Sequence, residues 1–588
     1  MPAFASPFTK ELRTNHVPSL RDRGHIQSLL IEPRKRLSEM NSKISELERS
    51  LNELKRERDI LEEEIEQHAL LLTPFRRLPD DMLREIFIAC LQDDRNAFMS
   101  CREAPLLLGL VCRKWRDLAY STPTLWASLH IPYPVPVDRT LVMDYHLLRT
   151  DVEMAMVEKH YTAVKDWLHR SGACPLSISF CCVHLGGRGQ NMHMLQGVVE
   201  TYVKILLDFS QRWRSLELFI PFGRCLNPIA DLPATSVPNL KHLRLTFSHD
   251  VQESQSSQWS SSSLLTAPTL KTLYISFMPF RLSSVPNKWD HLTSLTLSSS
   301  TPFLSHNVRT VANLEEAYAI FNKCRRLVHC ALDIFDVPAV ATVSGVLSLP
   351  HLKSLSIIDS CKTLSTLFEC FADMASIRGI SYHSNVLPSN HRQSPLITLL
   401  ERTDKQIEFL ELDSRHFTFT DLTTIFDLAS NVRHLVETWT SRDILPVSRS
   451  QNLIVPESFN LHKVFLNLLV APRRDGGMYF PRLLSLHLGR PCKLSDMDIL
   501  FFLQQRMEGS LNSGSGGEGI VPLQRMSIKL LSHNEEIDIS SRLSKYSSLK
   551  VEIGRPDPRR LLLTPKMTID PGIGCAARPI PAIILALD

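Results

Sequence analysis

Hydrophobic residues recur at alternating steps of three and four over residues 37–72. Nine of the eleven positions in this series are apolar, and the two exceptions are Arg58 and His68. Glu, Lys and Arg fill the positions between them, which is the a/d pattern of a coiled coil. The pattern predicts a coiled-coil helix over residues 25–73, after a disordered tail at residues 1–24. An apolar seam needs a partner, and the pattern leaves open whether that partner is a second copy or another part of the same chain.

Two shorter helical patterns follow Pro74. Residues 78–81 (LPDD) indicate a helix start, because proline is tolerated in a first turn and aspartates favour the positive end of the helix dipole. The apolar face of this helix is formed by Met82, Leu83, Ile86, Phe87 and Leu91. The polar stretch 92–103 predicts a loop, and residues 106–119 predict a second helix that ends before Pro123.

A different pattern dominates the rest of the chain. The motif L-x-x-L-x-[LI], often preceded by proline, has four strong copies, which begin at Leu240, Leu270, Leu352 and Leu483. Weaker copies begin at Trp213, Leu292, Leu327, Ile377, Ile407, Val432, Leu461, Leu523 and Leu549. The mean step is about 28 residues, and the pattern resembles a leucine-rich repeat. In such an array each unit contributes a short strand and shares its leucine core with its neighbours.

The pattern also predicts the limits of this array. Degenerate repeats are expected over residues 211–560, with loops at 251–264 and 510–520, and a tail at 561–588. We expect residues 131–210 to be a linker and an N-terminal cap for the first repeat. Within that cap, residues 143–171 have a helical pattern, with Trp167 and Leu168 on its apolar side, and residues 175–180 alternate as a strand does.

The residues between the predicted coiled coil and the cap match one known motif. The order is L-P-x-x-M-L-x-x-I-F, an apolar stretch, V-C-R-K-W-R-D-L-A and P-T-L-W, which stand at residues 78–87, 111–119 and 123–126. Residues 74–130 therefore resemble an F-box, with an internal loop longer than is usual. Cys112 is a usual F-box residue, and we expect it to be packed in the helical core as a small hydrophobe.

The resemblance implies a function and a set of contacts. F-box proteins dock on Skp1 and through it on a cullin, and many carry leucine-rich repeats that hold a protein substrate. The residues expected to line or support the Skp1 interface are Leu78, Pro79, Ile86, Leu110, Val111 and Trp115. The expected fold is therefore an α/β leucine-rich-repeat solenoid, horseshoe-like, preceded by a small all-α F-box and an N-terminal coiled-coil helix. The function implied is that of a non-catalytic substrate adaptor of a ubiquitin ligase; the alternative is a scaffold that binds Skp1 without directing ubiquitylation.

Side chains on the concave face of such a solenoid are candidates for substrate contact. In a repeat strand the variable positions face the concave side, and solenoids commonly bind extended partners there. The candidates are Lys241, His242, Arg244, Lys271 and Lys353. Ordinary solvated strand residues would give the same pattern, and the substrate itself is not indicated.

Composition excludes several other classes of protein function. The formal net charge of +4, from 66 basic and 62 acidic residues, is too balanced for a dedicated nucleic-acid binder. The 13 cysteines contain no C-x-x-C pair, so we expect free thiols and neither a zinc site nor a disulfide framework. No signal peptide, membrane span or catalytic motif set is found, which predicts a cytoplasmic or nuclear protein without a cofactor or an enzymatic activity.

Overall fold

The computed structural model describes most of the chain. The described residues are 6–12, 14–72, 77–132, 150–181, 192–220, 223–247, 259, 261–276, 289–298, 312–335, 343–361, 363–386, 392–403, 405–438, 461–473, 477–492, 494–512, 520–530, 539–543, 546 and 549–554. Most of the predicted loops at 251–264 and 510–520, and all of the predicted tail at 561–588, lie outside these residues. The chain divides into two compact units, Met1–Ile86 and Phe87–Asp588.

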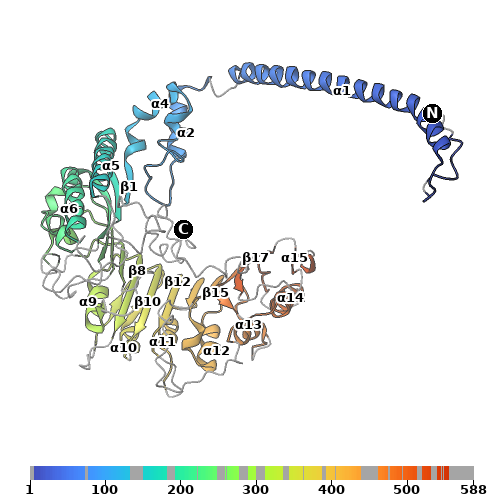
Figure 1. Ribbon diagram of the computed structural model, residues 1–588. Helices are drawn as coiled ribbons and strands as arrows, with labels where there is room; N and C mark the ends of the chain where they lie inside the picture. The colour runs from blue at the N-terminus through green and yellow to red at the C-terminus, as the bar shows by residue number, and fades with distance from the viewer. Residues whose placement is uncertain are drawn as a thin grey trace. The chain divides into compact units, whose positions relative to one another are not determined.

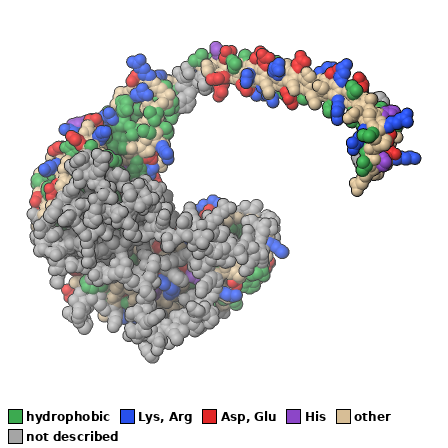
Figure 2. Space-filling model, in the orientation of Figure 1, with side chains coloured by type: hydrophobic (Ala, Val, Ile, Leu, Met, Phe, Trp, Pro, Cys, Tyr) green, Lys and Arg blue, Asp and Glu red, His purple; other side chains and the backbone are tan. Residues whose placement is uncertain are grey.

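The first unit consists mainly of one long helix, α1 (Leu20–Leu71, 52 residues), so the predicted N-terminal helix is confirmed (Figure 1). It begins inside the segment predicted to be a disordered tail, and Pro33 lies within it. The nine apolar seam residues are between 46% and 71% exposed. Basic and acidic side chains are interspersed along the helix, as Figure 2 shows.

Three helices and a 3-10 turn follow: α2 (Asp80–Ala89), α3 (Leu108–Val111), α4 (Arg113–Tyr120) and η2 (Pro123–Trp126). The helix predicted over residues 106–119 is therefore two helices, because Cys112 has an extended backbone with φ −158° and ψ 171°. This conformation turns Cys112 outward, and its Sγ accepts a hydrogen bond from the Trp115 backbone N–H at 3.4 Å. The expectation that Cys112 is packed in the core is wrong: the side chain is exposed and caps α4.

The second unit is built around a 15-stranded sheet in which every neighbouring pair of strands is parallel (Figure 1). Its strands are β1 (Ser128–Pro132), β2 (Leu176–Cys181), β3 (Trp213–Ile220), β4 (His242–Phe247), β5 (Thr272–Ser276), β6 (Ser294–Ser298), β7 (Ala312–Asn313), β8 (His329–Phe335), β10 (Ser354–Ser360), β12 (Gly379–Ser384), β13 (Phe409–Leu412), β14 (His434–Glu437), β15 (Ser485–Cys492), β16 (Arg525–Leu530) and β17 (Lys550–Gly554). Apart from β7, which pairs with β8 only, they follow one another in chain order, as expected of a solenoid. The α/β solenoid predicted from the repeats is thus the observed fold.

The returns between strands are helices or short turns. The α-helices are α5 (Thr150–Arg170), α6 (Met192–Asp208), α7 (Asn227–Ala230), α9 (Leu314–Lys323), α10 (Leu364–Glu369), α11 (Pro395–Glu401), α12 (Phe419–Leu428), α13 (Leu461–Val470), α14 (Asp496–Asn512) and α15 (Ile539–Arg542). The 3-10 turns are η4 (Ser210–Arg212), η5 (Gly223–Leu226), η6 (Ala234–Ser236), η8 (Ser263–Thr266) and η10 (Ser414–His416). A separate two-stranded sheet joins β9 (Leu347–Ser348) to β11 (Phe371–Asp373).

The register of the sheet explains the motif. Leu243, Leu273 and Leu295 are partners on β4, β5 and β6, and each is at most 1% exposed. The aligned leucines form one buried row across the sheet, so the leucine of each repeat packs beside that of the next. Because successive side chains in a strand point to opposite faces, the residues that precede these leucines form a second row on the other face.

Twelve of the thirteen predicted repeat starts lead into strands of this sheet. The exception is Leu461, which begins α13 instead. Val464, Phe465, Leu468 and Leu469 continue from it at helical spacing, so the segment LHKVFLNLLV carries a helix period that the repeat motif concealed.

The solenoid also begins earlier than predicted. Its first strand, β1, starts at Ser128, inside the segment 74–130 assigned to the F-box. β1, α5, β2 and α6 form successive strand and helix units at the start of the array, so the described residues of segment 131–210, expected to be a linker and an N-terminal cap, contribute a strand and helices to it. The two residues placed on the apolar side of this helix, Trp167 and Leu168, are 2% and 0% exposed.

Candidate partner-binding surfaces

A cluster of exposed apolar side chains lies on α3 and the residue before it. Leu107, Leu110 and Val111 are 43%, 60% and 57% exposed, and we call them the α3 patch. They are spaced i, i+3 and i+4, so they share one side of a helical turn. Leu108 between them is 5% exposed, so the opposite side of the same turn is buried.

The other predicted contact residues differ in their exposure. Pro79 is exposed, whereas Leu78, Ile86 and Trp115 are half-buried. The Trp115 ring packs against Phe87, which is fully buried, with ring centroids 4.9 Å apart. Trp115 therefore supports the helices from inside while part of its surface stays accessible.

Trp126 ties these helices to the solenoid. Its indole Nε1–H donates to the Ala119 carbonyl at 2.9 Å, which fixes the end of α4. Its ring stacks on Tyr120 at 5.3 Å and meets Trp167 of α5 edge-on at 4.8 Å. Trp167 in turn donates from its own Nε1 to the Ser128 carbonyl of β1 at 3.2 Å. The α3 patch is therefore carried on a base that is packed into the first strand and helix of the array.

The loop predicted at residues 92–103 is fixed against the sheet. Phe98 forms a parallel bridge with His130 on the edge strand β1, and the His130 N–H donates to the Ala97 carbonyl at 2.7 Å. Arg95 pairs with Glu103 at 2.5 Å and lies over the Phe98 ring at 4.5 Å. The long loop thus covers backbone groups of a sheet edge that would otherwise be open to pairing with another chain.

His130 is the buried polar residue of this contact. Its Nδ1 is 2.8 Å from the Ser179 hydroxyl on β2, and the side chain is 5% exposed. Burial, with a smaller contribution from Arg95, lowers the pKa of His130 from 6.5 to about 4. The imidazole is therefore neutral at physiological pH.

The predicted substrate-facing residues fall into two groups. Lys241, His242, Arg244 and Lys271 lie together on or just before β4 and β5, where the Lys271 N–H donates to the Lys241 carbonyl at 2.8 Å. Lys353 lies just before β10, three strands beyond β5. The structure thus brings four of the five together and leaves Lys353 apart.

Neighbouring groups affect the position of Arg244 and the pKa of His242. The Arg244 guanidinium lies over the Tyr274 ring at 4.0 Å, an attractive cation–π contact between neighbouring strands. Partial burial, followed by the charges of Arg214 and Lys241, lowers the pKa of His242. This end of the face therefore carries basic charge from arginine and lysine but not from the histidine.

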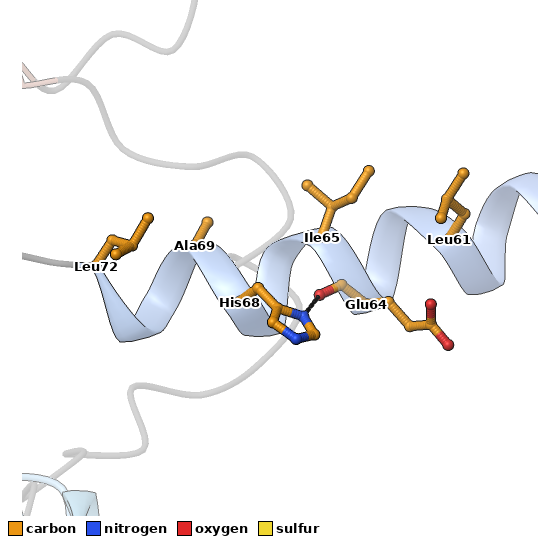
Figure 3. Close-up of a pocket in the computed structure, with 6 residues that line it drawn as sticks. All are labelled: Leu61, Glu64, Ile65, His68, Ala69 and Leu72. Carbon is orange, nitrogen blue, oxygen red and sulfur yellow. Dashed lines mark hydrogen bonds between the residues drawn. The ribbon is translucent and has the colours of Figure 1, made fainter.

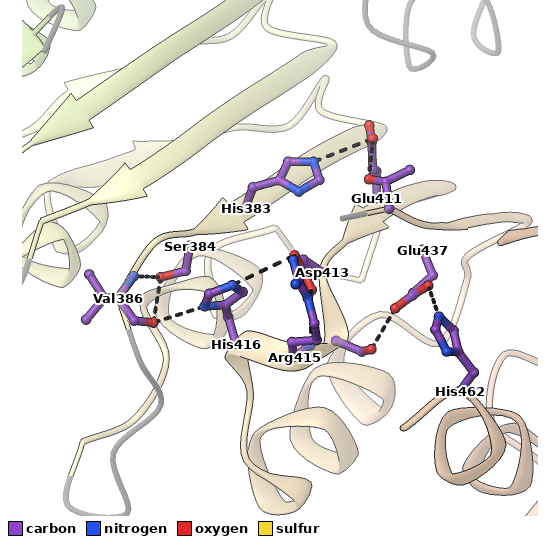
Figure 4. Close-up of polar contacts among 11 residues, drawn as sticks. His383, Ser384, Val386, Glu411, Asp413, Arg415, His416, Glu437 and His462 are labelled. Carbon is purple, nitrogen blue, oxygen red and sulfur yellow. Dashed lines mark hydrogen bonds and ion pairs between the residues drawn. The ribbon is translucent and has the colours of Figure 1, made fainter. Parts of the chain in front are cut away.

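A polar cluster that the sequence did not indicate lies farther along the same sheet (Figure 4). His383 of β12 approaches Glu411 of β13, with Nε2 and Oε1 3.5 Å apart, and the Thr438 hydroxyl donates to the same oxygen at 2.9 Å. Burial alone would raise the pKa of Glu411, but the hydrogen bonds and charge from His383, with bonds from Thr438 and Ser381, hold it below its ordinary value. The Glu411 carboxylate therefore stays ionised although it is largely buried.

Two further carboxylates organise the turn that follows β13. Asp413 is fully buried and binds the Arg415 guanidinium through both oxygens, at 2.9 and 2.6 Å. The Ser414 hydroxyl donates to Glu437 Oε1 at 2.7 Å, and Glu437 Oε2 lies 3.5 Å from His462 Nε2 on α13. These contacts tie β13, β14 and α13 together, so the evident role of the cluster is to hold this section of the array in shape.

Histidine–serine pairs recur between adjacent strands. The pairs are His130 with Ser179 at 2.8 Å, His329 with Ser354 at 2.8 Å, and His434 with Ser485 at 2.7 Å. The last two join first residues of neighbouring strands, which the repeat motif alone could have aligned. Recurrence at equivalent strand positions is typical of cross-strand side-chain pairing.

The chemistry that these groups could support is limited in the described part of the chain. No group of three or more His, Cys, Asp or Glu side chains is arranged there to hold a metal ion. Among the described helices, none combines the length and the apolar character needed to cross a lipid bilayer.

Comparison with known proteins gives little further guidance. No protein-family model matches the chain, and no curated protein matches its sequence. Among solved structures, the chain is similar to the crystal structure of the Rad7 and Elc1 complex in yeast, with 13% sequence identity and a TM-score of 0.29. The match covers 65% of this chain and 87% of that chain. A TM-score this low does not distinguish one repeat fold from another, so the solenoid assignment rests on the strand register.

Proposed function

We propose that this protein is a non-catalytic adaptor of the F-box type, which binds Skp1 through its helical segment and a protein substrate through its solenoid. The observation that carries the proposal is the α3 patch of three exposed apolar side chains, two of which, Leu110 and Val111, stand where the F-box resemblance expects the partner. Exposed apolar residues that gather on one side of a helix, above a buried base, are typical of a docking surface.

The F-box order of residues supports the identity of the partner. Leu78-Pro79, Ile86, Leu110-Val111 and Trp115 stand at the positions that contact or support Skp1 in the family. None of these six side chains is fully buried, so each keeps surface that a partner can reach.

The attachment of the helices supports the mechanism. Trp126 packs between α4 and α5, so a partner bound at the α3 patch is held in a fixed relation to the first strands of the array. A ligase assembled in this way raises the effective concentration of the ubiquitin-charged enzyme near a substrate on the array. In this proposal no residue of the chain acts as an acid, a base or a nucleophile.

The test is a binding measurement between the purified chain and Skp1. Changing Leu110→Glu together with Val111→Glu puts two charges into the patch, and we expect the affinity to fall about tenfold or more. The matched control is Val346→Glu, because Val346 is 75% exposed and lies in the array away from α3. The control should bind as the wild type does.

A second variant tests the start of the motif. Leu78→Ala together with Pro79→Ala should also weaken binding. Full binding by both double variants would contradict the adaptor proposal. Deletion of residues 78–126 is a poorer test, because it removes Trp126 from the core. The same double variant, Leu110→Glu with Val111→Glu, separates an adaptor from a Skp1-binding scaffold. For an adaptor, complexes purified with this variant should lack cullin, and the proteins that the wild type binds should become more stable. For a scaffold, their stability should not change.

A further inference from the structure

The seam of α1 has the features of an incomplete coiled coil. Figure 3 shows Leu61, Ile65, Ala69 and Leu72 projecting from one side of the helix, where they line an open groove. His68 belongs to the same groove, with its Nδ1 2.7 Å from the Glu64 carbonyl. Such a groove is the surface into which a facing helix inserts its side chains.

The two polar seam positions distinguish the ways in which two copies could meet. In a parallel, in-register pair every a position and every d position faces its own equivalent, so Arg58 would face Arg58 and His68 would face His68. Asp59 and Glu62 bind Arg58 and raise its pKa, so it carries a full positive charge. A parallel pair would therefore set two charged guanidinium groups against each other across the seam.

An antiparallel pair centred between Asn52 and Glu53 removes this conflict. Each a position then faces a d position of the second copy, and the residue numbers in each layer add to 105. The layers, in order, are Leu37 with His68, Ile44 with Leu61, Leu51 with Leu54, Arg58 with Leu47, and Ile65 with Met40. Arg58 keeps its own carboxylate partners and extends its methylenes over leucine, as long basic side chains do.

The charges beside the seam favour the same arrangement. In this antiparallel register Glu48 lies beside Lys55 of the second copy, and Lys43 lies beside Glu64, and symmetry repeats both attractive pairs. In the parallel arrangement the corresponding positions bring Lys43 beside Glu48 of the second copy, which is attractive, but also Glu57 beside Glu62, which is repulsive and offsets it. Charges at these flanking positions set partner choice and orientation in coiled coils.

We propose that α1 binds a second copy of this chain as an antiparallel coiled coil centred between Asn52 and Glu53. Ile44, Met40 and Leu37 of the second copy then fill the groove around Ile65. The C-terminal ends of the paired helices lie about 55 Å apart, from a rise of about 1.5 Å per residue. Two solenoids are thereby presented together, which raises the apparent affinity for a partner with two binding sites.

Oligomeric state is the first test, measured on the full chain by light scattering at micromolar concentration. The wild type should be a dimer, and Ile44→Asp should be a monomer because it places a charge in a seam layer. Ile60→Asp is the matched control, since Ile60 is 60% exposed but lies off the seam, and it should remain a dimer. A monomeric wild type, or a dimer insensitive to Ile44→Asp, overturns the proposal.

Orientation is tested by disulfide cross-linking of Ile44→Cys and Leu61→Cys chains, with the wild type as the control for the 13 native cysteines. The antiparallel register predicts a new cross-linked dimer only when the two variants are mixed and allowed to exchange. A cross-link formed by each variant alone is the parallel result and overturns the proposal.

Charge substitutions test the register. Lys55→Glu should weaken dimerisation roughly tenfold, because two attractive pairs become repulsive. Glu48→Lys combined with Lys55→Glu should restore it. Glu57→Lys should leave it unchanged, since Glu57 faces Ser50 in this register. Stronger association of Glu57→Lys with no effect of Lys55→Glu would be the parallel result.

Discussion

Helix α1 and the solenoid both carry leucine at regular intervals, yet the structure treats these leucines in opposite ways. Leu51 on the α1 seam is 52% exposed, whereas Leu355 on β10 is fully buried. The two residues are chemically identical, so the difference in exposure must come from whether neighbouring segments of the chain place apolar side chains over them.

In the solenoid each repeat supplies the cover for the previous one. Leu355 pairs with Cys330 on β8 and with Ile380 on β12, so its partners come from the preceding and the following repeat. A heptad repeat on a single helix has no such neighbour, because successive turns stack along the axis and none folds over the seam. One periodicity is completed within the chain, and the other requires a second helix.

The largest expected effect comes from truncating one leucine of each kind. Leu355→Ala removes buried methyl groups and leaves a cavity, which should cost about 2–5 kcal/mol of stability. In the monomeric Ile44→Asp background, Leu51→Ala should change the free energy of unfolding by less than about 0.5 kcal/mol, because without a second copy its side chain is exposed. Denaturant unfolding, followed by hydrogen exchange in β10 and α1, measures both. Equal losses for the two variants would refute the contrast.

A second prediction concerns acid sensitivity at the start of the solenoid. Above pH 6.5 His130 is neutral in the folded and unfolded chains, so it adds no pH dependence. As the pH falls from 6.5 toward about 4, His130 becomes protonated in the unfolded chain but stays neutral in the folded chain. The folded state is therefore destabilised relative to the unfolded state. The full loss corresponds to about 3 kcal/mol at 1.36 kcal/mol per pKa unit.

His130→Asn removes this titration and provides the measurement. The free energy of unfolding of the wild type and the variant is measured between pH 7 and pH 4.5. It should fall more steeply with decreasing pH in the wild type than in the variant. Hydrogen exchange in β1 and β2 should report the same loss locally. Parallel stability profiles for the two chains would show that His130 is not the group responsible.

The smallest effect is expected at the joint between the helices and the array. Trp126→Phe leaves the Ala119 carbonyl without its indole donor and should cost about 1–3 kcal/mol, with faster hydrogen exchange in α4. Trp289→Phe is the matched control, since its indole donates to the Leu265 carbonyl at the same 2.9 Å, within the array. It should destabilise the array without changing exchange in α4.

Short-range patterns predicted much of this fold. The heptads predicted α1, and the repeat motif predicted twelve strands of the sheet, because both periodicities state which side of a local element is apolar. The motif failed at Leu461, where apolar residues at helical spacing also satisfied it. The candidate residues Lys241 and Lys271 proved to be neighbours for the same reason, because the repeat step aligns them.

Local periodicity therefore predicted most of the helices and strands and which side of each is apolar, with the exceptions at Leu461, Cys112 and β1. What covers those apolar sides depends on contacts between segments that are distant in the chain. The Phe98 bridge to His130, the packing of Trp126 on Trp167, and the hydrogen bond from Ser414 to Glu437 join residues that lie far apart in the chain. Such contacts depend on the register of distant segments, and a one-residue shift would turn each side chain to the opposite face.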